Sequence, residues 1–221
     1  MAQDDFFELN AYVARAMDKR IGAFFASKIT AAADIDPLFK RLLLETERVM
    51  RLGGKRLRPT LALVGYRAAG GTDDELALDA ALALELLHGF MCVHDDIMDR
   101  DYMRHGGLNM SGRYSNSLRT KVKDGAERDH LAQSMSLLGG DLLITFVYEA
   151  IFTMDIPAET RLALMRQINE TTFFTVGGQQ LDVLYPLEGE VSVKRLLKIP
   201  YYKTSMYTFV NPLLFGATLA K

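Results

Sequence analysis

The stretch ELALDAALALELLHGFMCVHDDIMDRDYMR, which runs from Glu75 to Arg104, decides how this chain folds. Most of it is apolar on almost every side of a helical wheel, which predicts a helix buried at the centre of a bundle. Elsewhere, apolar residues recur three and four positions apart, and few segments alternate with a period of two. The sequence therefore predicts an all-α fold.

Helix breakers divide the chain into a series of expected helices. These helices span residues 4–31, 36–52, 57–69, 73–102, 128–153, 157–184 and 192–220. Thr72 is the expected N-cap of the central helix. The polar, basic stretch from His105 to Arg128 is expected to be a long loop or a mobile lid. No linker is evident, which predicts a single domain over residues 1–221.

Composition excludes several classes of protein. With 26 basic and 28 acidic residues the net charge is -2, so bulk charge does not predict binding to nucleic acid or to anionic lipid. The single cysteine, Cys92, rules out an intramolecular disulfide and fits a reducing compartment, and the first ten residues lack a secretory pattern. Glu85 and His88 interrupt the most apolar stretch. We therefore expect a cytoplasmic protein without a transmembrane segment.

Polar residues form one stripe along the apolar central helix. At about 100° per residue they fall within an arc of roughly 100°. The stripe consists of Glu85, His88, Cys92, Asp95, Asp96 and Asp99. Neighbouring carboxylates raise one another's pKa unless a cation lies between them, and magnesium suits flexible all-oxygen ligands. The stripe therefore predicts a magnesium site, although a charge run on a solvated helix end is the simpler alternative.

A second motif, GGKRLRP at residues 53–59, has the chemistry of a diphosphate cradle. Two glycines let the backbone approach an anion, and Lys55, Arg56 and Arg58 supply positive charge near a helix start. Its spacing is not that of a nucleotide-binding P-loop. The alternative is a helix terminus with ordinary solvated basic residues. Arg104 and His105 follow the acidic stripe, so that acidic and basic groups bracket one expected site.

Four motifs together resemble those of a known family. GGKRLRP, HDDIMDRDYMRHG, GGQQLD at 177–182 and YKT at 202–204 resemble, in order and spacing, the signatures of trans-isoprenyl diphosphate synthases, or polyprenyl synthetases. The resemblance extends from about residue 40 to residue 221. It implies an isoprenoid-synthase bundle of long helices around a deep cavity, usually as a homodimer. It also implies a Mg2+-dependent prenyltransferase that joins isopentenyl diphosphate to dimethylallyl, geranyl or farnesyl diphosphate.

The resemblance assigns roles to residues on the central helix and beside it. Asp95 and Asp99 would ligate magnesium with support from Asp96, and Arg104 would hold the allylic diphosphate. The residues implied to hold isopentenyl diphosphate are Gly54, Lys55, Arg58, His88 and His105. His105 stands where the family usually has arginine, so its charge depends on pH.

The resemblance also assigns roles near the carboxyl end. Gln179 and Asp182 share a helix face, which the resemblance turns toward the first acidic motif as part of the substrate site. A buried, hydrogen-bonded polar pair is the alternative. Lys203 would bind the leaving diphosphate, and Lys203 and Thr204 would stabilise the allylic cation. Alternatively, Lys203 reaches the surface along its own stem.

Two residues before the acidic motif are implied to limit product length. Phe90 and Met91 occupy the positions that help to form the floor of the elongation pocket in this family. A bulky aromatic residue here resembles short-chain synthases with C15 or C20 products, and we expect Phe90→Ala to lengthen the product. A plain core aromatic is the alternative interpretation of Phe90.

The chain departs from the family pattern at its carboxyl end. Family members continue beyond the position of Lys221 and carry a second aspartate-rich motif. We therefore expect a partial sequence, with weak or no turnover by the 221 residues alone while magnesium-diphosphate binding persists.

Three other functions compete with this interpretation. A terpene cyclase shares the acidic motif but does not need the second cradle. A metal-dependent phosphohydrolase would use His94 and Asp95, but His94 falls opposite the acidic stripe on the wheel. A non-catalytic partner subunit would bind a complete synthase and alter its product length.

Overall fold

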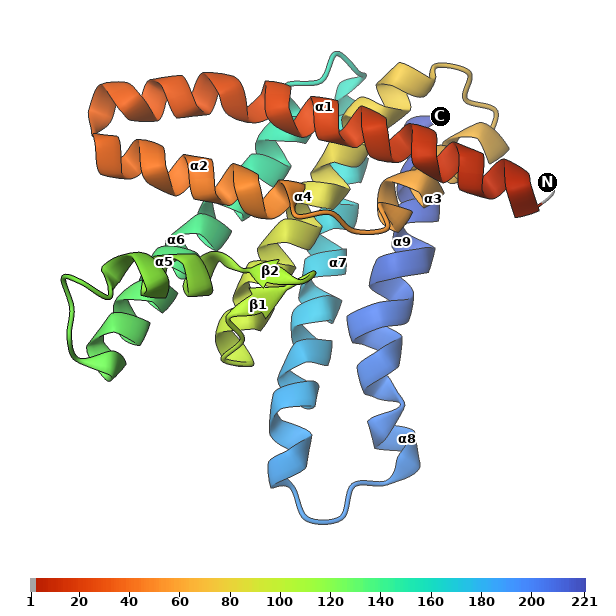
Figure 1. The fold of residues 1–221 in the computed structure, drawn as a ribbon. Coiled ribbons are helices and arrows are strands. Elements are labelled where there is room, and N and C mark those ends of the chain that lie inside the picture. The colour runs from red at the N-terminus through yellow and green to blue at the C-terminus, as the bar shows by residue number, and fades with distance from the viewer. Residues whose placement is uncertain (1–2) are drawn as a thin grey trace. The chain divides into compact units, whose positions relative to one another are not determined.

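The computed structural model of the chain describes the backbone of residues 3–221 and the side chains from residue 5 onward. The long helices are α1 (Gln3–Ile35), α2 (Pro37–Arg51), α3 (Leu57–Ala68), α4 (Asp74–Met98), α6 (Gly125–Phe152) and α7 (Ala158–Leu184). The short elements are β1 (Met103–Arg104), β2 (Gly107–Leu108), α5 (Met110–Leu118), η1 (Tyr185–Leu187), α8 (Val193–Leu196), the π-helix η2 (Pro200–Val210) and α9 (Asn211–Leu219). Figure 1 shows the order of these elements, and the predicted all-α class is confirmed.

The segment predicted as a loop is partly helical. The two-residue strands β1 and β2 form an antiparallel hairpin, and α5 follows it. Asn109 caps α5, because its side chain accepts a hydrogen bond from the Gly112 N–H at 2.9 Å, and Met110 and Tyr114 are buried. The loop prediction is therefore wrong for residues 110–118.

Two helix boundaries also differ from the predictions. The central helix is capped by Asp73 rather than Thr72, since the Asp73 carboxylate accepts a hydrogen bond from the Leu76 N–H at 3.1 Å. It ends at Met98, earlier than predicted, because the chain turns into the β1–β2 hairpin. Helix α2 is capped by Asp36, whose side chain accepts a hydrogen bond from the Leu38 N–H at 2.7 Å.

The last predicted helix, 192–220, is three segments in the structure. A short helix α8 is followed by the π-helix η2 and by α9. Pro200 and Pro212 lie in the first turns of η2 and α9. Proline has no N–H to donate to the preceding turn, so each marks the start of a new helical segment. The chain is thus helical over most of the predicted span, but it forms three segments, and the middle one is a π-helix rather than an α-helix.

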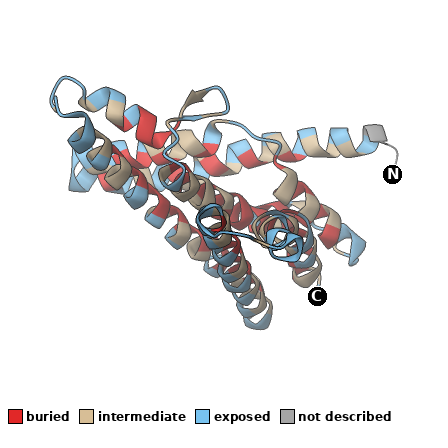
Figure 2. Cartoon of the chain, turned by 90° about the horizontal axis from the view of Figure 1, so that it is seen from below, coloured by how far each residue is buried: buried red, intermediate tan, exposed pale blue. Residues whose placement is uncertain are grey.

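The described residues divide into two compact units, and each is treated by itself. The first unit contains residues 1–56 and 82–149. Here α1 lies alongside α2 (Figure 1) and buries an apolar row, seen as a broken stripe on the N-terminal helix in Figure 2. The row consists of Val13, Met17, Ile21 and Phe25, spaced three and four apart. Gly89 of α4 packs directly on the Met50 side chain of α2, and a side chain at this glycine would overlap Met50.

The second unit contains residues 57–81 and 150–221. Its most extensive helix–helix contact is between α3 and α9. A side chain at Gly65 would overlap the Leu213 backbone, and one at Gly216 would overlap the Ala62 carbonyl. Helix α7 runs beside η2, where Gly178 faces the backbone of Lys203. Small residues thus allow these helices to approach closely.

Two helices, α4 and α6, are long and apolar enough to cross a membrane by length and composition alone. Of the most apolar window, 67% is buried inside the protein in α4 and 44% in α6. The core helix of a globular fold passes the same test, so this composition is weak evidence of a membrane span. The absence of a transmembrane segment stays a prediction.

Candidate active site

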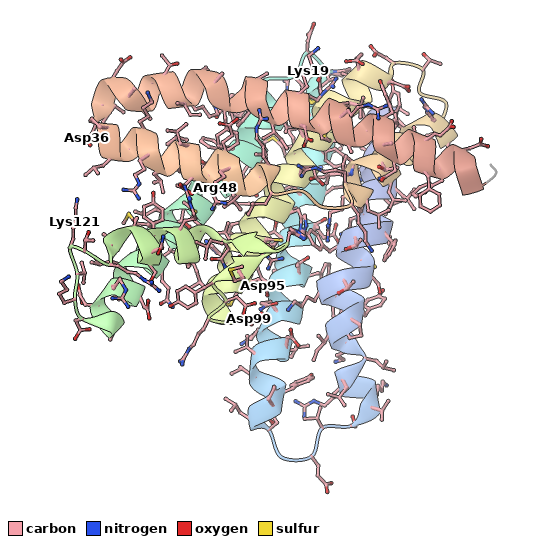
Figure 3. All side chains as sticks on the ribbon, viewed as in Figure 1. Lys19, Asp36, Arg48, Asp95, Asp99 and Lys121 are labelled. Carbon is pink, nitrogen blue, oxygen red and sulfur yellow. The ribbon has the colours of Figure 1, made fainter. Side chains whose placement is uncertain are left out.

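The carboxyl end of α4 carries three aspartates that differ in burial. Asp95 is half-buried, Asp96 is buried at 4% exposure, and Asp99 is exposed just beyond the helix end. The Asp99 N–H still donates to the Asp95 carbonyl at 2.8 Å, which continues the helical turn. Figure 3 labels Asp95 and Asp99 near the lower end of α4. The two side chains best placed to meet solvent are therefore one turn apart, as the sequence suggests.

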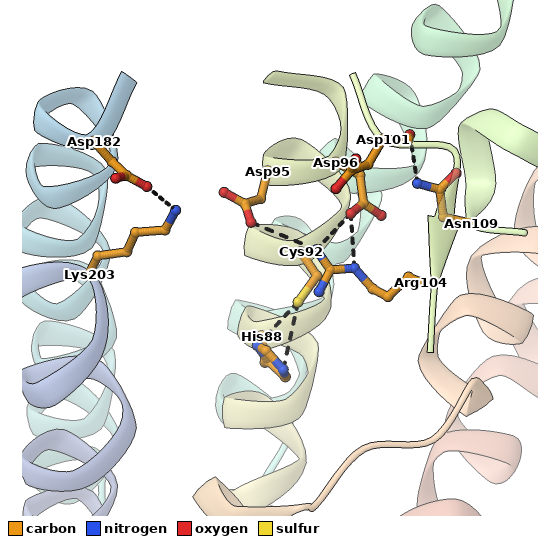
Figure 4. A network of polar contacts seen from close by, with 9 residues as sticks. All are labelled: His88, Cys92, Asp95, Asp96, Asp101, Arg104, Asn109, Asp182 and Lys203. Atoms are coloured by element: carbon orange, nitrogen blue, oxygen red, sulfur yellow. Dashed lines mark hydrogen bonds and ion pairs between the residues drawn. The ribbon is translucent and has the colours of Figure 1, made fainter. Parts of the chain in front are cut away.

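Arg104 lies against these aspartates. Its Nε and Nη2 atoms both donate to Asp96 Oδ1, at 2.9 and 2.6 Å, and Nη2 is 3.7 Å from Asp95 Oδ2. The β1–β2 hairpin places Arg104 there by turning at His105 and Gly106, which have φ of 51° and 78°. Figure 4 shows this network. Arg104 thus supplies part of the positive charge that the clustered carboxylates require.

Electrostatics at this pair follow from burial. Burial raises the pKa of the Asp96 carboxyl, and hydrogen bonding to Arg104 opposes that shift only in part. Burial works against the charge of Arg104, but the hydrogen bond to Asp96 and the nearby Cys92 and Asp95 outweigh it and raise the Arg104 pKa above its ordinary value. Arg104 is therefore a permanent cation beside Asp95.

The rest of the stripe is engaged with protein partners. Cys92 Sγ lies 3.4 Å from His88 Nδ1, one turn below the aspartates (Figure 4). Further down the helix, the buried Glu85 carboxylate accepts a hydrogen bond from Arg56 Nη1 at 2.5 Å. The predicted stripe thus makes three separate sets of polar contacts, at Glu85, at His88 with Cys92, and at Asp95 with Asp96.

The glycine-rich turn between α2 and α3 is only partly as predicted. Gly53 and Gly54 have φ of 98° and 135°, values that favour glycine, and Lys55 is exposed. Arg56 instead points inward and is 7% exposed. The expectation that Arg56 supplies charge to an anion is therefore wrong. The sequence did contain a signal for this internal role of Arg56. Glu85 lies in an apolar helix, and a buried carboxylate needs a cationic partner.

In the second unit, Arg58 lies at the start of α3. Its Nη2 donates to Thr208 Oγ1 at 2.7 Å, and its guanidinium carbon lies 4.0 Å from the centre of the Tyr207 ring. Both partners belong to η2. The Arg58 Nε atom is buried without a hydrogen-bond partner among the described residues. A planar guanidinium group held in this way suits binding of a phosphate.

Also in the second unit, Lys203 on η2 contacts Asp182 on α7. Lys203 Nζ donates to Asp182 Oδ2 at 2.6 Å, the separate contact drawn in Figure 4. Their side chains are 26% and 42% exposed, so neither charge is fully desolvated. Gln179, one turn before Asp182, has a buried Nε2 atom without a hydrogen-bond partner among the described residues, and Thr204 is exposed. The GGQQLD and YKT motifs thus meet in one place.

The two chain-length candidates face different ways. The half-buried Phe90 packs edge-on against His94, with ring centres 4.6 Å apart. His94 also packs on Gly140 of α6, and its Nε2 is 3.8 Å from Asp141. This face is roughly opposite the acidic stripe, whereas Met91 is about 40° from Asp95 on the wheel. Met91 is therefore the candidate nearer to the acidic face.

The donor set fits magnesium that is held mainly by substrate. Within residues 3–221 the described side chains form no group of three or more ligands of His, Cys, Asp or Glu type arranged around one metal position. Asp96 is hydrogen-bonded to Arg104, and Asp95 and Asp99 place two further carboxylates, which are hard oxygen ligands, one helical turn apart. Magnesium is commonly bound by one or two carboxylates with waters and phosphate oxygens. These two aspartates therefore fit that mode.

Comparisons with known proteins agree with the motifs. Residues 40–221 match the polyprenyl synthetase family. The chain is 32% identical over 174 residues to a geranylgeranyl diphosphate synthase of Cyanophora paradoxa, covering 76% of this chain and 52% of that protein. It is 30% identical over 173 residues to a short-chain isoprenyl diphosphate synthase of Methanothermobacter thermautotrophicus, covering 78% of this chain and 47% of that protein. The chain thus spans about half the length of these relatives.

A solved structure gives the same result for the fold. The crystal structure of a geranylgeranyl pyrophosphate synthase from Corynebacterium glutamicum, complexed with isoprenyl diphosphate and magnesium, matches all of this chain with a TM-score of 0.86 and 25% identity. The match covers 61% of that chain. With the family match over residues 40–221, these findings show that the chain belongs to the polyprenyl synthetase family.

Proposed function

We propose that this protein is a magnesium-dependent prenyltransferase, which condenses isopentenyl diphosphate with an allylic diphosphate to give a C15–C20 prenyl diphosphate. The observation that carries the proposal is the acidic end of α4. There a permanent cation, Arg104, lies 3.7 Å from Asp95 and 2.6 Å from the buried Asp96. A diphosphate needs both kinds of group, since carboxylates hold its metal ions and guanidinium groups bind the oxygens that the metal leaves uncovered. The family membership supports the same reaction.

The reaction breaks one carbon–oxygen bond and forms one carbon–carbon bond. The allylic carbon leaves its diphosphate, which keeps the electron pair, and the double bond of isopentenyl diphosphate attacks the resulting cation. A proton is then lost to the released diphosphate, so no side-chain base is required. Arg104 binds the allylic diphosphate, and Lys55 and Arg58 bind isopentenyl diphosphate. Magnesium, when bound beside Asp95 and Asp99, supplies positive charge that stabilises the leaving diphosphate.

Lys203 has a separate role in this proposal. Asp182 holds its ammonium group in place at 2.6 Å, which lowers the entropy that Lys203 loses on binding a diphosphate. Both side chains keep some exposure, so the ammonium can be shared between Asp182 and an incoming phosphate oxygen. Thr204, on the same helix, would stabilise the allylic cation with its hydroxyl dipole.

Turnover is the direct test. Purified protein is incubated with labelled isopentenyl diphosphate and each allylic primer in turn, with and without magnesium, and products are sized by chromatography. From the 221 residues, which span about half the length of their relatives, we expect at most weak magnesium-dependent formation of C15 or C20 product, lost in Arg104→Ala. If the chain makes no product but changes the product length of an added complete synthase, the result would support a non-catalytic partner subunit. Cyclic hydrocarbon product would support a terpene cyclase.

Assembly and location belong to the same proposal. A homodimer follows from the family resemblance, and a cytoplasmic location is supported by the single cysteine, Cys92, which fits a reducing compartment. Sedimentation of the purified protein tests whether it forms a homodimer.

A further inference from the structure

The turn that joins α2 to α3 has an unusual backbone. Gly53, Gly54 and Arg56 have φ of 98°, 135° and 44°. Glycine adopts such angles readily, whereas arginine does so only where its surroundings impose them. The conformation at Arg56 must therefore be explained by contacts that this residue makes.

The Arg56 guanidinium group joins three helices of the first unit. Its Nη1 donates to Glu85 of α4 at 2.5 Å, and its Nη2 donates to Asp18 of α1 at 2.9 Å and to the Met50 carbonyl at 2.8 Å. Met50 lies in the last turn of α2, where carbonyl groups have no partner within the helix. Arg56 thus caps α2 while it is anchored to α1 and α4.

Burial makes the contact with Glu85 the strongest of these anchors. Arg56 is 7% exposed and Glu85 is 2% exposed, whereas the Asp18 side chain is 56% exposed. Burial opposes the charge of Arg56, but the Glu85 carboxylate outweighs it and raises the Arg56 pKa. A rigid, forked guanidinium reaches several acceptors at once, which a lysine ammonium does not do in the same geometry.

The backbone of the neighbouring Lys55 is held by a hydrogen bond, whereas its side chain is exposed. Its carbonyl accepts a hydrogen bond from Asn10 Nδ2 at 2.8 Å. The turn is therefore fixed at Lys55 by α1 and at Arg56 by the buried ion pair. With the Lys55 carbonyl and the Arg56 guanidinium group both held, the backbone is anchored at the end of the turn that follows the two glycines.

We propose that Glu85, acting through Arg56, is a positioning residue that holds the turn of Gly53, Gly54 and Lys55 in its diphosphate-binding conformation. This inference rests on the proposed function of that turn. Glu85 lies on the same helix as Asp95, so a single rigid element positions the turn and carries the metal-binding aspartates.

The test compares two ligands in one variant. In the full 221-residue chain, Glu85→Gln removes the charge while keeping size and hydrogen-bonding atoms. Titration calorimetry is expected to show roughly tenfold or greater weakening for isopentenyl diphosphate, because the turn is displaced, and less than about twofold for geranyl diphosphate with magnesium. The matched control is Glu149→Gln, which breaks the Lys28–Glu149 ion pair of 2.6 Å elsewhere in the same unit. It should change neither affinity.

A second measurement needs no ligand. Hydrogen exchange at the amides of residues 53–57 is expected to accelerate in Glu85→Gln and not in Glu149→Gln. A further variant, Arg56→Met with Glu85→Leu, replaces the ion pair by apolar side chains that preserve folding. It should unfold near the wild-type temperature and still bind isopentenyl diphosphate weakly.

The outcomes separate this inference from the proposed function. Normal affinity of the apolar double variant for isopentenyl diphosphate contradicts the positioning role. So does unchanged amide hydrogen exchange in Glu85→Gln, and so does an equal loss of affinity for isopentenyl diphosphate and geranyl diphosphate in that variant. A wild-type chain that binds no isopentenyl diphosphate contradicts the proposed function itself.

Discussion

Asp96 and Asp99 belong to one short motif but have different surroundings. Asp96 is buried against Arg104, whereas Asp99 is exposed beyond the helix end. We expect Asp96→Asn to lower the free energy of unfolding by about 1 to 3 kcal/mol, between the values typical of exposed and buried ion pairs. Asp99→Asn should change it by less than about 0.5 kcal/mol. Urea unfolding of both variants checks this, and equal destabilisation would show that the assignment of burial is wrong.

Met91 and Phe90 differ in the face of α4 that they occupy. Phe90 packs on His94, away from the acidic stripe, and Met91 lies nearer to Asp95. Both substitutions to alanine should lengthen the product, but Met91→Ala by more, because its removal opens space on the side where the chain grows. Product sizing by chromatography tests the order. A larger effect of Phe90→Ala would contradict it, and an unchanged profile in both variants would remove the chain-length role altogether.

At the scale of elements, Glu45 of α2 forms an ion pair with α5. The Glu45 carboxylate accepts from Arg48 Nε at 2.7 Å and from Arg113 of α5 at 3.2 Å. Burial tends to raise its pKa, but the two arginines outweigh burial and lower it from the ordinary 4.5. A lowered folded-state pKa means that this stabilisation is present above pH 4.5 and is lost as pH falls through the folded value.

Glu45→Gln should therefore affect stability only at higher pH. At pH 7 we expect the variant to be less stable by about 1 kcal/mol, with the difference shrinking as pH falls below 4.5 and through the folded-state pKa of Glu45. Urea unfolding over a series of pH values measures this. A difference that does not change with pH would contradict the ion-pair explanation.

Two adjacent glycines of α7 form a matched pair. A side chain at Gly178 would lie 2.6 Å from the Lys203 backbone nitrogen, whereas one at Gly177 meets nothing within 4 Å. Gly178→Ala should destabilise the protein by about 1 to 3 kcal/mol, because η2 must move away. Gly177→Ala should be neutral or stabilising by up to about 1 kcal/mol, since alanine favours a helix. Similar thermal unfolding of both variants would contradict the close contact of α7 and η2.

Local patterns in the sequence predicted most of the elements and the polar stripe on α4. They missed α5, because Met110, Tyr114 and Leu118, although spaced four apart, lie in a run that is otherwise polar and contains glycine and serine. They also missed the π-helix, since its backbone hydrogen bonding has no distinct apolar period. The partners of Arg56 and Lys203 lie 29 and 21 residues away, and no local pattern encodes such pairings. The positions of the motifs on helices were therefore predictable, whereas the protein groups that already neutralise some of their charges were not.

At the scale of the whole molecule, the family is shown by the match over residues 40–221, while the reaction is a proposal. The proposal makes one requirement of this chain. Asp95 and Asp99 must bind magnesium together with an allylic diphosphate, while Asp96 keeps Arg104 in position. This requirement involves residues of the first unit alone and does not depend on turnover.

Calorimetric binding of geranyl diphosphate, with and without magnesium, tests that requirement most directly. In the wild-type chain we expect magnesium to strengthen binding. We expect the variant with both Asp95→Asn and Asp99→Asn to lose at least about 100-fold in affinity, because loss of a residue that only supports a metal ligand already costs about 10- to 100-fold. Asp34→Asn, an exposed carboxylate on α1, serves as the control. Binding that is independent of magnesium, or equal in the double variant and the wild type, would contradict the account.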